Sequence, residues 1–134
     1  MAASQIGAAL KARLAALVFS PAIPVAWGNI NYVPTGSRFL VVQIARAPNQ
    51  RMTIAKGNRQ VGSLVVTVAS VAGNGSGEGE GIADAIEAWF PVDLIMSMAS
   101  GRLRITATAS IRDGYENAGY WRTPVVIPFE VLTA

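Results

Sequence analysis

Two carboxylates in the second half of the chain have the spacing of a catalytic pair. Asp84 and Glu87 stand three residues apart in the segment IADAIEAWF, so a helix there would carry both on one face. A general acid and base would also need a pocket and a third group, and the sequence indicates neither. Two carboxylates on an exposed helix face are usually just solvated. The sequence therefore predicts no catalytic residue here.

The remaining reactive residue types are scarce. The chain has 134 residues and contains no Cys and no His, which removes the common nucleophilic machinery and zinc sites. The glycine-rich segment GNGSGEGEG, residues 73–81, opens a helix but matches neither phosphate-loop nor dinucleotide spacing. Glu78 and Glu80 would also repel phosphate. We therefore expect a protein that is not an enzyme, with no metal and no cofactor.

Charge is distributed unevenly along the chain, although the net value is only +3. Residues 1–77 hold seven basic and no acidic residues, whereas residues 78–134 hold four basic and eight acidic ones. The two parts therefore carry +7 and −4. Opposite patches on one subunit would suit a head-to-tail contact between copies. The alternative is that the two parts interleave in the fold and produce no charge separation.

Hydrophobic periodicity and turn residues predict the order helix, two strands, helix, two strands. Ile6, Leu10 and Leu14 recur at helical spacing, and Pro21 ends that helix. Pro128 lacks an amide donor, which places the last strand at an edge or at a bulge. The predicted helices span residues 4–18 and 82–90, the strands 38–46, 61–71, 102–112 and 125–132, and a polar hairpin connection 47–60.

This order indicates an α+β fold, with an antiparallel-rich, mixed sheet of four to five strands and two helices packed on it. We expect one domain, residues 1–134. No apolar run approaches the ~18 residues that cross a bilayer, so no membrane partner is expected. The protein is expected to be made in a cytoplasm.

Two further segments carry residues that suit contacts rather than catalysis. Arg102, Arg104 and Arg112 alternate with apolar residues and form a basic, hydroxyl-rich face, which would meet water, a phosphate backbone or a neighbouring subunit. Trp27, in a segment that also holds Asn29 and Tyr32, would either complete the edge of the core or lie at an interface. Periodicity does not decide between these alternatives.

Three blocks of the chain resemble the tail terminator proteins of long-tailed phages, relatives of the lambda-like minor tail protein U. The first block follows the N-terminal helix and reads AWGN and then YVPTGSRFLVVQI. The others are QVGSLVVTVASVAGNGSGEGEGIADAIEAWF and YWRTPVVIPFEVL. The likeness covers most of residues 20–132 and consists mainly of patterns of small, apolar and aromatic residues. No invariant functional residue carries over.

The resemblance implies a structural role in the neck region of the virion tail. A terminator of this type forms a homohexameric ring on the tail tube, stops tube polymerisation and presents a surface to the head connector, while DNA passes through the lumen. On this interpretation the hairpin carries the tube or subunit contacts, at Arg46, Arg51, Met52, Lys56 and Arg59. Trp27, Asn29 and Tyr32 lie near the subunit seam, and the face of Arg102, Arg104 and Arg112 either lines the lumen or is solvated. The alternatives are a head–tail joining or tail-completion protein, and a non-specific nucleic-acid-binding module.

Overall fold

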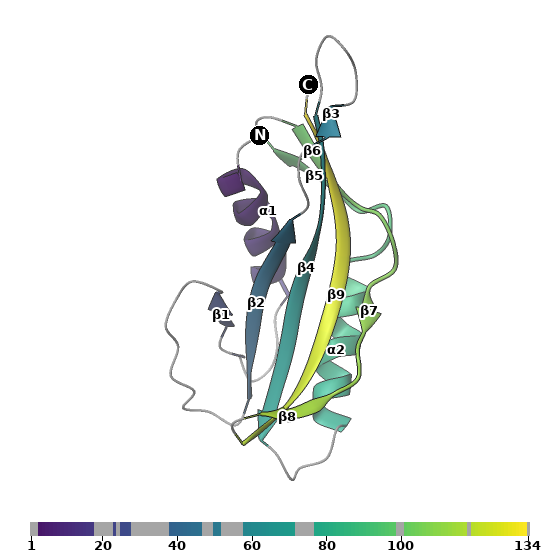
Figure 1. Ribbon diagram of the computed structural model, residues 1–134. Helices are drawn as coiled ribbons and strands as arrows, with labels where there is room; N and C mark the ends of the chain where they lie inside the picture. Colours follow the sequence, from purple (N-terminus) through teal and green to yellow (C-terminus); the bar gives the residue numbers. More distant parts are fainter. Residues whose placement is uncertain are drawn as a thin grey trace.

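The chain folds into two helices and a curled, mixed β-sheet (Figure 1). The computed structural model describes residues 3–17, 23, 25–27, 38–46, 50–51, 58–71, 77–98, 101–117 and 119–133. The helices are α1 (Ala3–Ala15) and α2 (Gly77–Trp89). The strands are β1 (Val25–Trp27), β2 (Arg38–Arg46), β3 (Gln50–Arg51), β4 (Asn58–Val71), β5 (Ile95–Met98), β6 (Gly101–Ile105), β7 (Ser110–Ile111), β8 (Tyr115–Asn117) and β9 (Tyr120–Thr133).

The sheet is larger than the four to five strands that the sequence predicts. Its main order is β1-β2-β4-β9-β6-β5; β3 pairs with β4, and β7 and β8 pair with β9. The β1–β2 pair is parallel and every other described pair is antiparallel, so the α+β, mixed and antiparallel-rich expectation is confirmed. The additional strands are two to five residues long, and elements this short leave little periodic signal.

The β2–β4 hairpin forms as predicted. Nine residues of β2 pair with β4, from Arg38 opposite Ser70 to Arg46 opposite Gly62. β4 begins at Asn58 rather than at residue 61, because its polar start pairs with both β3 and β9. Gly62 is required where the strands approach closely: a Cβ there would meet the carbonyl oxygen of Ala45 and lie 2.9 Å from the ring of Phe129.

The sequence predicts the last strand at an edge or at a bulge, and the edge position is wrong. β9 lies in the middle of the sheet, between β4 and β6, and pairs with β4 over fourteen residues. The hydrogen-bonding groups of its prolines point away from β4. The carbonyl oxygens of Pro124 and Pro128 accept hydrogen bonds from the amides of Arg112 and Thr106. Pro128 thus faces the interruption between β6 and β7, Pro124 faces the one between β7 and β8, and no β4 bond is lost.

The predicted strand 102–112 is likewise interrupted. β6 ends at Ile105 and β7 begins at Ser110, so the alternation that suggested one strand runs through four residues outside the strands, of which Thr106 still donates to Pro128. Leu103, Ile105 and Ala109 are buried as that alternation predicts, but Ala107 is exposed.

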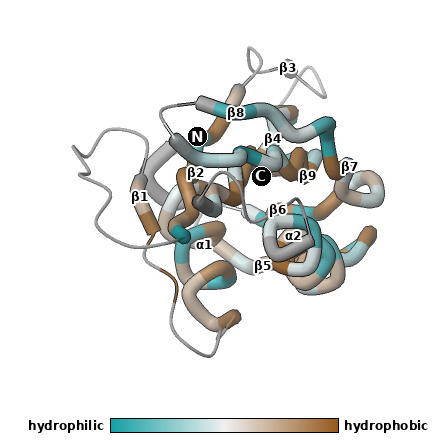
Figure 2. The backbone as a smooth tube through the Cα atoms, turned by 90° about the horizontal axis from the view of Figure 1, so that it is seen from below, coloured by the Kyte–Doolittle hydropathy of each residue, from teal (hydrophilic) through white to brown (hydrophobic). Residues whose placement is uncertain are grey.

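Both helices pack on the same face of the sheet (Figure 2). The stripe Ile6, Leu10 and Leu14 of α1 is buried and joins one cluster with Ile86 and Phe90 from the second helical segment. Inward-facing residues of β2, β4, β6 and β9 complete this core. Fully burying an aliphatic or aromatic side chain contributes about 1.5–3 kcal/mol, so this single apolar layer dominates the stability of the fold. No described helix covers the opposite face of the sheet, which we call the bare face.

The start of α2 also differs from the prediction. The helix begins at Gly77, so the last five residues of the predicted loop 73–81 are helical. Gly77, Gly79 and Gly81 have low helix propensity, which favours a loop in the sequence alone. Packing against the sheet overrides it, since a Cβ at Gly79 would lie only 3.2 Å from Oγ1 of Thr123. Glycine lets the first turn approach the sheet closely.

The C-terminal ends of the two helices cap each other. Nε and Nη2 of Arg13 donate hydrogen bonds of 3.2 and 2.8 Å to the carbonyl oxygen of Trp89, the last residue of α2. Nε1 of Trp89 donates a 2.7 Å bond to the carbonyl oxygen of Arg13, and the guanidinium lies 4.2 Å from the indole centroid. The carbonyl of Trp89 at the end of α2 is thereby satisfied, that of Arg13 gains a second donor beside the amide of Ala16, and a cation lies at the negative end of α2.

Candidate functional site: oppositely charged surfaces on the two sides of the sheet

One solvent-accessible flank of α2 carries a row of acids, which we call the acidic stripe. Glu80, Asp84 and Glu87 follow one another at spacings of four and three residues, so they lie on one side of the helix. Glu80 and Asp84 are exposed and Glu87 is half-buried. The ion pairs among the described residues involve none of the three.

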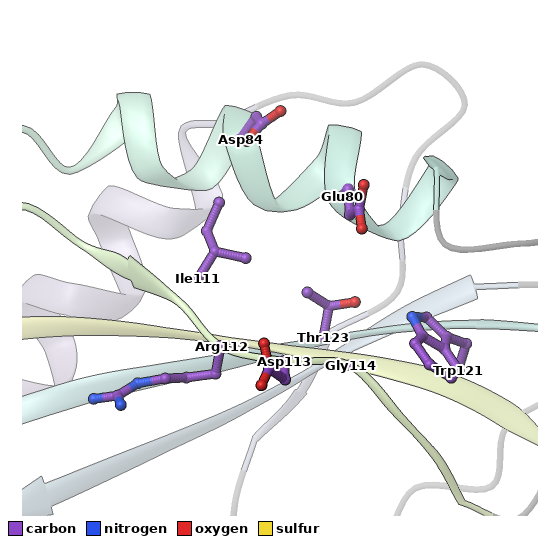
Figure 3. Close-up of a pocket in the computed structure, with 8 residues that line it drawn as sticks. All are labelled: Glu80, Asp84, Ile111, Arg112, Asp113, Gly114, Trp121 and Thr123. Carbon is purple, nitrogen blue, oxygen red and sulfur yellow. The ribbon is translucent and has the colours of Figure 1, made fainter.

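A cavity of about 330 Å³ lies between the N-terminal half of α2 and the sheet (Figure 3). Asp113 adds a third carboxylate to those of Glu80 and Asp84, while Ile111 points toward α2 and the guanidinium of Arg112 extends away from the acids. The lining residues are Glu80, Asp84, Ile111, Arg112, Asp113, Gly114, Trp121 and Thr123. The cavity is therefore acidic, with an indole at one end.

Two buried hydroxyl groups lie beneath this end of α2. Among the residues that the structure describes, Oγ of Ser70 and Oγ1 of Thr123 have no hydrogen-bond partner, although each residue is only 1% exposed. An unsatisfied buried hydroxyl costs about 1–3 kcal/mol. The polar groups at the N-terminal end of α2 are thus incompletely paired, in contrast to its C-terminal end.

Three arginine side chains point to the bare face and are spread along it. Alternation along β6 and β7 directs Leu103 and Ile111 toward the helices, so Arg102, Arg104 and Arg112 take the opposite direction. This orientation follows the predicted alternation, although Arg102 and Arg104 lie in β6 and Arg112 follows β7. What this face contacts stays a prediction. Arg102 and Arg112 are exposed. They flank β9 near Leu132 and Pro124, eight residues apart, which corresponds to about 26 Å.

Arg104 belongs to an ion cluster at one end of the bare face. Glu130, only 7% exposed, accepts hydrogen bonds of 2.9 Å from both Arg59 and Arg104, and Arg104 also pairs with Asp93 at 2.7 Å. Hydrogen bonds from Arg59 and then from Arg104 hold the pKa of the Glu130 carboxyl below its ordinary value, against an opposing effect of burial. This cluster joins β4, β6 and β9.

The other end of the bare face has an aromatic cluster. The rings of Phe39 and Tyr120 meet edge to face with centroids 4.9 Å apart, and the guanidinium of Arg122 lies 5.5 Å from the Phe39 centroid. Between the two clusters the face is apolar and half-buried, with Val65 directly opposite Val126 and with Pro124 beside them.

The structure describes only some of the residues that the sequence predicts to contact the tail tube or a neighbouring subunit. Arg46 and Arg51 lie at the end of β2 and in β3, but their side chains, like that of Trp27 in β1, are outside the described part. Arg59 is held by Glu130 at the start of β4. Met52, Lys56, Asn29 and Tyr32 lie outside the described residues.

Chemical groups of other kinds do not assemble in the described part of the chain. Among those residues, no three His, Cys, Asp or Glu side chains are arranged to hold a metal ion. None of the described helices has the length and apolar character needed to cross a membrane.

The comparisons identify the family. The chain belongs to the phage tail terminator protein family, whose model matches residues 5–129. This family assignment makes the chain a structural component of a virion tail. Five chains of solved structures match it, and one of them superimposes with a TM-score of 0.82 and 26% sequence identity, over 98% of this chain and 96% of that one. No curated protein sequence matches the chain.

Proposed function

We propose that this protein closes into a ring, six copies in number, at the head-proximal end of the tail tube. The ring stops further addition of tube subunits and offers a docking surface to the head connector. The observation that carries this proposal is the family match over residues 5–129. The separation of charge supports it, because acids on the helix side and arginines on the bare face give each copy two different surfaces.

The proposal assigns the hairpin at the start of β4 to the tail tube. Arg51, Met52, Lys56 and Arg59 provide the contacts, with Arg46 at the base of the hairpin. Trp27, Asn29 and Tyr32 belong to the subunit seam. DNA passes through the lumen without being held, and the protein requires no cofactor and catalyses no reaction.

Electron microscopy of particles made with the gene interrupted tests this function. Uncontrolled, overlong tails without heads are expected, because nothing then stops the tube. Tails of normal length beside detached, full heads would instead show that the protein joins head to tail, and would overturn the terminator proposal. Restoring the gene in trans is the control for effects on neighbouring genes.

A further inference from the structure

The acidic stripe and the bare face lie on opposite sides of the same part of the sheet. α2 packs on β9, β4 and β7, and the bare side of those strands carries Arg112. An object with complementary surfaces on its two opposite sides associates head to tail, and such a contact closes into a ring or extends as a filament.

A partner that covers the bare face must contact apolar side chains as well as charged ones. Around Arg112, the face presents apolar side chains that no described helix covers. We define the docking patch by its residues, which are exposed or half-buried: Val65, Ser110, Arg112, Pro124 and Val126. Of these residues, arginine is the type that is enriched at protein interfaces, and the aliphatic side chains around it would be removed from water by a cover.

The acidic stripe, in contrast, requires a cation from a partner. Its carboxylates have no cation among the described residues, and Arg112 of the same copy extends away from them (Figure 3). The stripe from Glu80 to Glu87 is about 10 Å long, from the helical rise. The docking patch is of comparable extent, since it covers about 7 Å along β9, from Pro124 to Val126, and about 10 Å across β4, β9 and β7.

We propose that the acidic stripe of α2 docks on the docking patch of a second copy, with the guanidinium of Arg112 entering the acidic cavity beside Glu80, Asp84 and Asp113. This inference rests on the ring of the proposed function and names the two surfaces that form it. The contact is heterologous, so each copy uses its helix side for one neighbour and its bare face for the other. Several unpaired carboxylates then gain one cation, and the apolar patch is removed from water.

Duplex DNA is the other conceivable occupant of an arginine-bearing face, and two observations disfavour it. Arg104 is already engaged by Glu130 and Asp93, which lowers the positive charge available to phosphates. The patch around Arg112 is largely aliphatic, whereas phosphate contacts come from charged, hydroxyl and amide groups. A second copy satisfies both the apolar and the charged part of the surface.

Disulfide trapping tests the contact, because the natural chain has no cysteine and any disulfide must come from introduced residues. The double variant Asp84→Cys/Ser110→Cys of the full chain is oxidised at high protein concentration and separated on a non-reducing gel. Both sites are exposed and lie on opposite sides of the sheet, so a bond within one copy is excluded by geometry. We expect a ladder of linked oligomers, with at least fivefold more dimer than in a matched control.

The matched control is Asp84→Cys/Arg102→Cys, which places the second cysteine on the bare face but about 26 Å from Arg112. Equal crosslinking in the two double variants, or none in either, would overturn the inference. A charge exchange gives an independent reading: Asp84→Arg should reduce self-association by at least tenfold, and adding Arg112→Asp should restore it. Failure of the second change to restore association would also contradict the contact.

The results separate this inference from the proposed function. Overlong tails in the gene interruption with no trapped ladder would mean that the ring forms through other surfaces. A ladder with tails of normal length would mean that the copies associate but do not terminate the tube. Binding of a duplex DNA probe that falls equally with Arg112→Glu and Arg102→Glu, without any ladder, would assign the bare face to phosphates instead.

Discussion

The two ends of α2 differ in how completely their polar groups are paired. At the C-terminal end, Arg13 and Trp89 satisfy each other's backbone carbonyl groups and stack closely. At the N-terminal end, in the described part of the chain, the buried hydroxyl of Thr123 has no hydrogen-bond partner and Glu80 and Asp84 have no cation. The C-terminal end of α2 therefore has the properties of a structural joint within the chain. The N-terminal end has the properties of a surface that binds a partner.

This difference separates stability from assembly within one helix. Paired groups at the C-terminal end contribute to the free energy of unfolding of the single chain. The unpaired acids at the N-terminal end contribute little to it, and they are therefore free to change for the needs of a contact between copies. Substitutions at the two ends should consequently have effects on different measurements, which allows the comparison to be tested residue by residue.

The largest effect is expected at the joint. Trp89→Ala removes packing against the core, one hydrogen bond and the cation–π contact, and should lower the free energy of unfolding by about 3 kcal/mol. Urea unfolding followed by circular dichroism measures it. Trp89→Phe keeps most of the packing and should cost about 1 kcal/mol. Equal losses in the two variants would show that the hydrogen bond, and not the packing, matters.

A second structural effect is expected in the ion cluster. Glu130→Gln leaves Arg59 and Arg104 without their buried carboxylate and should destabilise the fold by about 2 kcal/mol. Asp93→Asn is the matched control, because the side chain of Asp93 is 71% exposed and such pairs contribute under about 1 kcal/mol. If both changes lowered the free energy of unfolding equally, buried ion pairs would stabilise this chain no more than exposed ones. The distinction drawn between the two ends of α2 would then fail.

The same carboxylate predicts a dependence of stability on pH. The pKa of Glu130 is lower in the folded chain than in the unfolded one, so its contribution is complete above the unfolded pKa and is lost as the pH falls through the folded pKa. The difference in unfolding free energy between the natural chain and Glu130→Gln should therefore be constant at neutral pH and shrink below about pH 4.5. Urea unfolding at pH 7, 5, 4 and 3 measures it, and a difference that stays constant down to pH 3 would contradict the ion pair.

A change of opposite sign is expected beneath the N-terminal end of α2. Thr123→Val replaces an unpartnered buried hydroxyl by a methyl group of similar size and should raise the free energy of unfolding by about 1 kcal/mol. Thermal unfolding of this variant beside Ser70→Ala, which also removes a hydroxyl but leaves a small void, separates polarity from volume. A marked loss of stability in Thr123→Val would mean that its hydroxyl has a partner after all.

The smallest effect on stability is expected in the acidic stripe itself. Asp84→Asn should change the free energy of unfolding by less than about 0.5 kcal/mol, because the carboxylate is exposed and has no described partner. Its self-association should nevertheless weaken, as measured by sedimentation at low salt. A stability loss comparable to that of Glu130→Gln would place Asp84 with the structural groups and remove the distinction between the two ends.

Strongly periodic segments were predictable from the sequence. The stripe of Ile6, Leu10 and Leu14 and the long apolar strand 38–46 identify α1 and β2, and the basic connection correctly indicates their hairpin neighbour β4. Local rules failed where tertiary packing decides. Glycines suggest a loop at the start of α2, yet Gly79 is there because the helix approaches Thr123 closely.

The central place of β9 shows a second limit. Pro128 correctly indicates a missing hydrogen bond, but only the register shows that the missing donor faces an interruption rather than an open edge. The candidate contact surface was also only partly predictable, because local patterns indicate its parts but not how they are placed. The alternation around Arg102 and Arg112 indicates a basic face, whereas the acids of α2, taken alone, look merely solvated. Their relation across the sheet depends on non-local strand order.

A reconstruction of the head-proximal end of the tail by electron cryomicroscopy would test the central claim most directly. The account predicts a closed ring of six copies of this chain seated on the last ring of the tube, with α2 of each copy against the bare face of its neighbour. Density for this chain on the head side of the connector only, or its absence from the tube end, would contradict the account.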